Sequence, residues 1–218
     1  MAGLTSSTIG RKYAMALSAM FLLIFLILHL VTNFLSVISA DAFNEASHFM
    51  GKNPLVQFLM QPVLLFAVLF HFIMGFVLEI KNNKARPVKY AVNGSSANSS
   101  WMSRNMIISG AFILVFLAIH LLDFWVPTIS KNYLGAPSHG TEFDHLKSQF
   151  SELWRVIAYI VAFILLGLHL AHGFQSSFQS IGARHPQYTP VIKTLGNWYS
   201  VLIPAGFIFI ALFHFLNN

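Results

Sequence analysis

The chain has 218 residues, of which 56% are hydrophobic and only 9% are charged, against roughly 25% charged residues in an average soluble domain. This composition indicates an integral membrane protein built as one bundle. No cysteine occurs, which excludes disulfides, cysteine-ligated iron–sulfur clusters and thiol nucleophiles within the chain. The net charge of +6 is spread over loops rather than along a basic stripe, so no nucleic-acid partner is expected.

Five apolar segments follow one another along the chain, each at or above the roughly 20 residues that cross a bilayer as a helix. Backbone hydrogen bonds must be satisfied within each segment, so all five are predicted to be helices of an all-α membrane protein. The first segment is too long for a signal peptide and lacks a convincing cleavage site, so it is kept as a span. The predicted helices lie near residues 13–38, 56–80, 105–127, 153–180 and 195–216.

The distribution of basic residues predicts the orientation. Counting by alternating compartment puts nine Lys and Arg on the side of the N-terminus and of the 81–104 loop, and four on the other side, where most acids also fall. The positive-inside rule then predicts a cytoplasmic N-terminus and an outer C-terminus. The nine are Arg11, Lys12, Lys81, Lys84, Arg86, Lys89, Arg104, Arg184 and Lys193, and the four are Lys52, Lys131, Lys147 and Arg155.

The polar connections differ in character. Residues 91–100, AVNGSSANSS, are a Gly/Ser/Asn-rich linker on the predicted cytoplasmic side. On the outer side, residues 41–50 and 141–154 mix acids with aromatic residues at roughly helical spacing. Such segments are typical of interfacial helices, and they are predicted to cover the outer end of the bundle.

Histidines flanked by apolar residues recur in four of the five segments, and their depth is informative. With a rise of about 1.5 Å per residue, His29 lies roughly 25 Å above Lys12 and His120 roughly 24 Å above Arg104, both in the outer half. The second and fourth helices run inward, which puts His71 and His169 at a similar inner level. Two pairs of histidines are thus predicted at two heights.

A buried imidazole inside a bilayer normally has a partner. A metal ion held on opposite sides by two imidazoles is one such partner, and a porphyrin adds a flat apolar body that an aromatic-rich bundle can enclose. The pattern therefore predicts two b-type haems with bis-histidine ligation and an electron-transfer function. Gly75 and Gly173 follow the inner histidines by four residues, so the edge of a macrocycle could approach the backbone there.

Alternatives remain beside this interpretation. A lone intramembrane histidine can serve as a helix–helix hydrogen-bonding group, and the two glycines can be small packing contacts. His214 has no partner at its level and is predicted to be structural. A transporter would also bury histidines, but it would be expected to bury carboxylates with them. The remaining histidines are interpreted as solvated loop residues, namely His48, His139, His145 and His185.

Several motifs resemble the di-haem cytochrome b membrane anchors of succinate:quinone oxidoreductases, the five-helix type of succinate dehydrogenases and fumarate reductases. The resemblance covers essentially the whole chain. It is carried by the opening SSTIGRKYAMALSAMFLLIFLILHLVTN, by HFIMG in the second helix, by IHLLDFW in the third and by HLAHG in the fourth.

The resemblance implies which residues hold each haem. His29 and His120 would hold the distal haem, and His71 and His169 the proximal one. Within HLAHG, His172 precedes Gly173 directly and remains an alternative ligand, but His169 is favoured because it reproduces the spacing from His71 to Gly75.

The resemblance also implies partners and a substrate. A flavoprotein and an iron–sulfur subunit would dock on the cytoplasmic side and carry out the succinate or fumarate chemistry, so this chain would transfer electrons and react with quinone, menaquinone being favoured. Quinone is predicted at the outer end, near Glu45, Asp123 and Trp125, although Glu45 can equally be a solvated acid. Succinate dehydrogenase is favoured over fumarate reductase, and a quinone-linked anchor of another dehydrogenase or of a hydrogenase remains open, as does the oligomeric state of the complex.

Overall fold

The computed structural model describes residues 7–84, 104–137 and 140–217. Within these ranges the chain is helical, with short connections and no strand. The 91–100 linker, His139 and two of the basic residues counted for the orientation, Arg86 and Lys89, lie outside the described residues.

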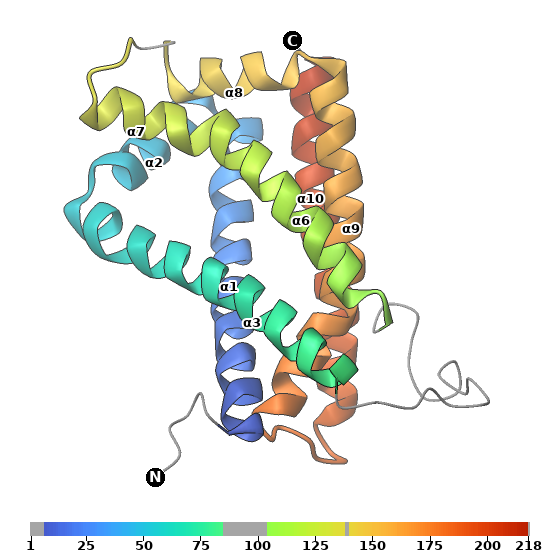
Figure 1. Ribbon diagram of the computed structural model, residues 1–218. Coiled ribbons are helices and arrows are strands. Elements are labelled where there is room, and N and C mark those ends of the chain that lie inside the picture. Colours follow the sequence, from blue (N-terminus) through green and yellow to red (C-terminus); the bar gives the residue numbers. More distant parts are fainter. Residues whose placement is uncertain (1–6, 85–103, 138–139, 218) are drawn as a thin grey trace.

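Five helical stretches are long and apolar enough to cross a membrane, as predicted (Figure 1). They are α1 (Thr8–Ile38), η1 with α3 (Val56–Met60 and Gln61–Lys84), α6 with η2 and α7 (Met106–His120, Leu121–Trp125 and Val126–Tyr133), α9 (Leu153–Ser180) and α10 (Thr189–Leu216). Several begin earlier or end later than predicted, because polar residues continue the helices beyond the apolar runs. The fifth begins six residues early, where Pro190 stands in the first turn, a position that tolerates proline because the N–H it lacks would have no partner there.

Two π-helical turns interrupt the second and third spans without breaking them. The turn η1 ends two residues before Pro62, and η2 ends two residues before Pro127. A proline cannot donate to the carbonyl four residues before it, and a wider turn accommodates its ring. The carbonyl released by Pro127 is that of Asp123, and His145 Nε2 donates a hydrogen bond to it at 2.7 Å.

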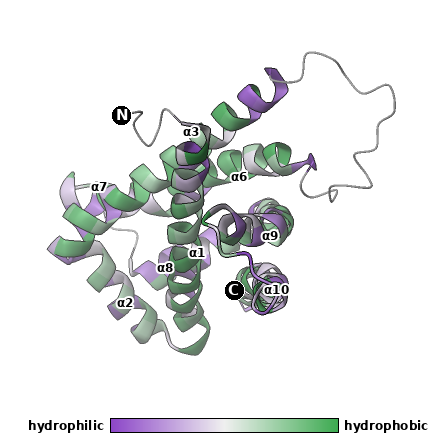
Figure 2. Cartoon of the chain, turned by 90° about the horizontal axis from the view of Figure 1, so that it is seen from below, coloured by the Kyte–Doolittle hydropathy of each residue, from purple (hydrophilic) through white to green (hydrophobic). Residues whose placement is uncertain are grey.

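The helices α9 and α10 pack closely along their length, and α1 packs against both. Figure 2 shows α9 and α10 side by side, while α3 and α6 run obliquely (Figure 1). Small residues permit the close approach: a Cβ added at Gly167 would lie 3.0 Å from the carbonyl oxygen of Ser200. The helix α3 packs mainly on α1, and its other faces expose large apolar side chains such as Phe66 and Ile73, as a lipid-facing helix requires.

The two segments predicted as interfacial helices form α2 (Ala40–Lys52) and α8 (Glu142–Phe150). Together with α7 they cover one end of the bundle (Figure 1), and we refer to these three helices as the cap. Asn44 Oδ1 accepts from the backbone N–H of Phe143 at 2.9 Å, and Lys131 pairs with Glu142 at 2.9 Å. Thr141 begins α8 in a capping box, and hydrogen bonds from its hydroxyl and backbone N–H hold the pKa of the Asp144 carboxyl below its usual value.

The largest buried cluster lies between the cap and the adjoining halves of α9 and α10. Its members are apolar or aromatic, namely Phe43, Leu146, Phe150, Val156, Tyr159, Phe163, Ile203, Phe207, Ile210 and Ala211. Apolar burial therefore anchors the cap to the span helices and excludes water from this end of the bundle.

Candidate redox site

The inner pair of histidines comes from α3 and α9. The ring centres of His71 and His169 lie 6.4 Å apart, with their planes at 67°. The sequence places these residues 98 positions apart, so only the packing of the bundle brings them together. His172, one turn further along α9, is half-buried and does not take part in this ring contact.

The outer pair comes from α1 and from the last residue of α6. The ring centres of His29 and His120 lie 5.7 Å apart, with their planes at 84°. Each imidazole stacks on the phenylalanine four residues before it: Phe25 on His29 at 5.2 Å and Phe116 on His120 at 5.8 Å. The four histidines are thus paired across helices as their depths predict, and aromatic rings restrict the orientation of the outer two.

Two serines set the hydrogen bonding of the inner histidines. The Ser18 hydroxyl donates to the carbonyl of Met15 at 2.8 Å and lies 3.3 Å from His71 Nδ1. The Ser109 hydroxyl donates to the carbonyl of Met106 at 3.0 Å and lies 3.2 Å from His169 Nδ1.

The direction of these contacts defines the tautomer. Each serine has one proton and gives it to a backbone carbonyl, so its oxygen can only accept from the imidazole. Nδ1 of His71 and of His169 therefore carries the proton. In a neutral imidazole this leaves the lone pair on Nε2, the form that binds a metal ion.

The serines belong to a sequence repeat that was not among the sequence-based predictions. The pattern Met-x-x-Ser followed by His eleven residues after the Ser runs from Met15 to His29 and again from Met106 to His120. The pattern His-x-x-x-Gly, already noted from the sequence, occurs at His71 and again at His169. The signal was present in the sequence as a constant offset of 91 residues between the first and third spans (106 − 15 and 120 − 29).

The two glycines face the same helices as these serines. A Cβ added at Gly75 would lie 3.7 Å from Met15 Cε, and one at Gly173 would lie 3.3 Å from Met106 Cε. Each glycine is therefore covered by the flexible end of a methionine rather than by backbone. Methionine ends can shift to admit a flat ring at modest cost.

The two histidine pairs differ in the hydrogen bonding of their Nδ1 atoms. Asn33, one turn beyond His29, donates through its amide to the His29 carbonyl at 2.8 Å and lies 3.3 Å from His29 Nδ1. His120 Nδ1 is buried without a hydrogen-bond partner among the described residues. Serine hydroxyls therefore serve the inner pair alone.

A serine also contacts His214, which lies outside both histidine pairs. The Ser36 hydroxyl donates to the Asn33 carbonyl at 2.7 Å and lies 2.8 Å from His214 Nε2. His214 is almost fully buried, and its ring contacts those of Phe143 and Phe213. The contact joins α10 to α1, as expected of a structural histidine.

Asp123, a predicted quinone residue, is buried in the bundle beyond His120. Its Oδ2 accepts a hydrogen bond from Tyr159 Oη at 2.8 Å and lies 3.3 Å from Arg155 Nε. The Tyr159 ring in turn stands edge-on to His120 at 6.1 Å. His145, interpreted from the sequence as a solvated loop residue, instead joins α8 to this region through the Asp123 carbonyl.

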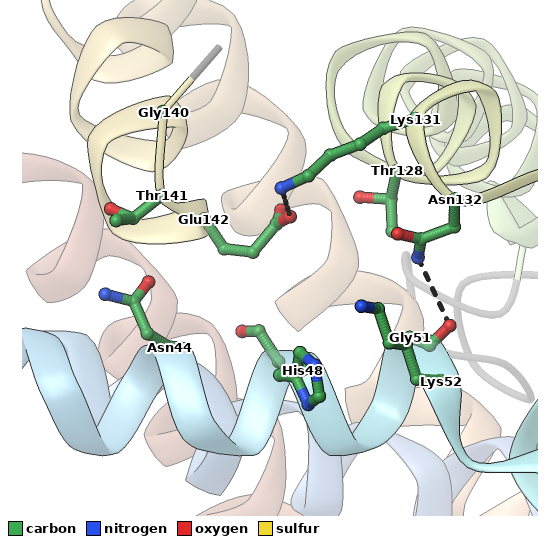
Figure 3. Close-up of a pocket in the computed structure, with 11 residues that line it drawn as sticks. Asn44, His48, Gly51, Lys52, Thr128, Lys131, Asn132, Gly140, Thr141 and Glu142 are labelled. Atoms are coloured by element: carbon green, nitrogen blue, oxygen red, sulfur yellow. Dashed lines mark hydrogen bonds and ion pairs between the residues drawn. The ribbon is translucent and has the colours of Figure 1, made fainter. Parts of the chain in front are cut away.

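The other two predicted quinone residues lie elsewhere on the same end. Glu45 is exposed on α2, and Trp125, which is 41% exposed, donates to Gln61 Oε1 at 3.2 Å. A cavity of about 290 Å³ lies within the cap (Figure 3). Polar side chains line it, among them Asn44, His48, Lys131 and Glu142, and none of the three predicted quinone residues belongs to its lining.

The types of side chain that could bind a metal indicate whether the site suits a bare metal ion or a metal-containing cofactor. Among the described residues, no three or more His, Asp or Glu side chains cluster in a way that could hold a bare metal ion. Facing imidazole pairs suit an ion that takes only two protein ligands, as iron in a porphyrin does. Two imidazoles on one metal ion, each with a nitrogen about 2 Å away, have ring centres roughly 6 Å apart, close to the separations of both pairs. The residues therefore fit two bis-histidine haems.

Comparison with known proteins agrees with this geometry. The family described as the succinate dehydrogenase/fumarate reductase transmembrane subunit matches residues 82–188. The succinate dehydrogenase cytochrome b558 subunit of Bacillus subtilis is 25% identical over 190 residues, which cover 87% of this chain and 86% of that protein. The chain is therefore similar to this family over about half of its length, and to the cytochrome b558 subunit over most of its length. No solved structure matches it.

These similarities and the five apolar helices bear on several expectations. The chain is a multi-pass protein of the bacterial cytoplasmic membrane and serves as a cytochrome b membrane anchor. The similarity implies b-haem and quinone binding in general, and a complex with a flavoprotein and an iron–sulfur subunit.

Proposed function

We propose that this anchor carries electrons between the iron–sulfur subunit and membrane quinone through two b haems, one held by His71 and His169 and the other by His29 and His120. The observation that supports the proposal most is the pairing itself: four histidines from four helices meet as two pairs, with ring centres 6.4 Å and 5.7 Å apart. Haem iron with both axial positions filled supplies one-electron transfer without a vacancy for oxygen or substrate.

The residues of the chain would orient the histidine ligands and keep water away from them. Ser18 and Ser109 would keep Nδ1 of the inner histidines protonated, which would leave the lone pair on Nε2 for a metal ion. Phe25 and Phe116 hold the outer imidazoles by stacking. The buried aromatic cluster beneath the cap keeps water away from the outer pair.

The direction of electron transfer in this proposal follows from the distribution of basic residues between the two ends of the bundle. With the N-terminus in the cytoplasm, electrons from the iron–sulfur subunit would reach the His71/His169 level first and the His29/His120 level second. The cytoplasmic end would then be the one that carries Arg11, Lys12, Lys81 and Lys84, and the cap would face outward.

Quinone would react at the outer end, menaquinone being the favoured substrate. Tyr159 and Arg155 occupy Asp123 Oδ2, so we assign Asp123 to the support of the outer histidine level rather than to free contact with quinone. Glu45 is accessible on the cap as a proton carrier, and Trp125 lies at the side of the bundle. Succinate oxidation is favoured over fumarate reduction as the physiological direction.

The test is a count of haems in the purified complex. A dithionite-reduced minus oxidised spectrum with chemical haem quantification should give two b haems per chain, and flavoprotein and iron–sulfur subunits should co-purify in mild detergent. Absence of b haem would refute the ligand assignment. One haem per chain would remove one of the two pairs, and His71→Ala and His29→Ala would show which.

A further inference from the structure

Arg11 is a basic residue of α1 whose charge is not compensated within the described part of the chain. Its Nε is buried and has no hydrogen-bond partner there. Arg11 takes part in neither the Lys131–Glu142 nor the Arg155–Asp123 ion pair. The residue as a whole is half-buried, but a buried N–H donor without an acceptor is costly, so its Nε is expected to meet an anion.

The position of Arg11 on α1 indicates where that anion lies. Arg11, Met15 and Ser18 are spaced at i, i+4 and i+7, so they share one face of the helix. Met15 covers Gly75 of α3, and Ser18 contacts His71. Arg11 therefore stands about two turns, roughly 10 Å, from the inner histidine level and on the face that borders it.

One acid of α3, Glu79, lies toward the level of Arg11 but does not pair with it. Glu79 follows Gly75 by four residues on α3 and so lies toward the level of Arg11. Its Oε1 accepts from Asn83 Nδ2 at 3.1 Å, and it makes no ion pair with Arg11. Arg155 at the outer end offers a contrast, because it has both Asp123 Oδ2 at 3.3 Å and the Trp154 ring at 4.7 Å. Of these two arginines, Arg11 alone lacks a compensating group.

We propose that Arg11 binds a carboxylate side arm of the haem held between His71 and His169. The inference rests on the proposed function, since it requires a haem at the inner level. A b haem carries carboxylates at its edge, and a guanidinium group matches a carboxylate in a bidentate geometry. The flat ring would pass beside Met15 and Gly75, and its carboxylate would end at Arg11, which closes the inner end of the site.

The test compares Arg11→Gln with Lys12→Gln in the assembled complex. Lys12 carries the same charge one residue along the helix, but its side chain is exposed, so it is the matched control. Arg11→Gln should retain the inner haem about tenfold less tightly during detergent washing, as expected for one lost charge-assisted hydrogen bond. The haem that remains should have a lower midpoint potential, because a positive charge beside the carboxylate has been removed. Arg11→Lys should be intermediate, and Lys12→Gln should behave as the wild type.

Three outcomes would overturn the assignment. Equal behaviour of Arg11→Gln and Lys12→Gln would identify Arg11 as an ordinary membrane-interface cation facing lipid phosphate. Normal haem with loss of the iron–sulfur subunit would identify an acidic group of the partner as the anion. An effect of Glu79→Gln as large as that of Arg11→Gln would make Glu79 the partner. Failure of the proposed function is distinguishable, because the wild-type complex would then contain no b haem at the inner level.

Discussion

The serines beside the inner histidines give the sharpest prediction. Replacing Ser18 or Ser109 by alanine removes the oxygen that accepts from Nδ1 of His71 or His169, at 3.3 Å and 3.2 Å respectively. A hydrogen bond at Nδ1 makes an imidazole a stronger donor to its metal ion and so favours oxidised iron. Each alanine variant should therefore raise the midpoint potential of the inner haem.

The size of the shift follows from the hydrogen bond. A net contribution of about 0.5–1.5 kcal/mol for one neutral hydrogen bond, taken at about 59 mV per tenfold change for one electron, sets an upper limit of roughly 20–60 mV for each variant, because only the difference in bond strength between oxidised and reduced iron shifts the potential. In the proposed site, both serines would act on ligands of the same iron. The double variant should therefore shift the potential by about the sum of the single shifts.

The assay is a potentiometric titration of the purified complex, followed through the absorbance of the reduced b haems. Ser36→Ala is the matched control, because the Ser36 hydroxyl also contacts an imidazole nitrogen, Nε2 of His214, a histidine outside both pairs. It should leave both potentials unchanged. Unchanged potentials in Ser18→Ala and Ser109→Ala, with both haems retained, would refute the role of the serines, and an equal shift in Ser36→Ala would point to a general effect of losing a hydroxyl.

Four further variants address other parts of the molecule. His169→Ala should abolish the inner haem spectrum, whereas His172→Ala should retain it because its ring stands outside the pair; the reverse result would make His172 the ligand. His145→Ala leaves the carbonyl released by Pro127 without its donor and should destabilise the complex by about 1–3 kcal/mol, seen as a lower melting temperature in detergent, and an unchanged melting temperature would mean that the cap does not depend on this bond. Glu45→Gln should slow quinone turnover while haem content and succinate oxidation by an artificial acceptor stay normal; wild-type turnover would remove Glu45 from the proton route.

The sequence alone was sufficient for the spans, the two interfacial helices and the two levels of histidines. Each of these follows from local properties. The length of an apolar run decides whether a helix crosses a bilayer, and the constant rise of a helix converts sequence distance into depth. The early start of α10 and the extension of the third span to Tyr133 were not predicted, because polar residues can continue a helix outside the hydrocarbon core.

Only the tertiary structure shows which side chains from different helices contact one another. Helical rise gives depth but not rotation about the helix axis or the neighbours of each face. Ser18 is 53 residues from His71, and Ser109 is 60 residues from His169, so no local pattern could join them. In the same way, the depth of Asp123 allowed a contact with quinone or with a covering helix, and the structure shows that α9 supplies Tyr159 and Arg155 to its carboxylate. The apolar sequence determined how deep each polar side chain lies, and the packing of helices determined what each one binds.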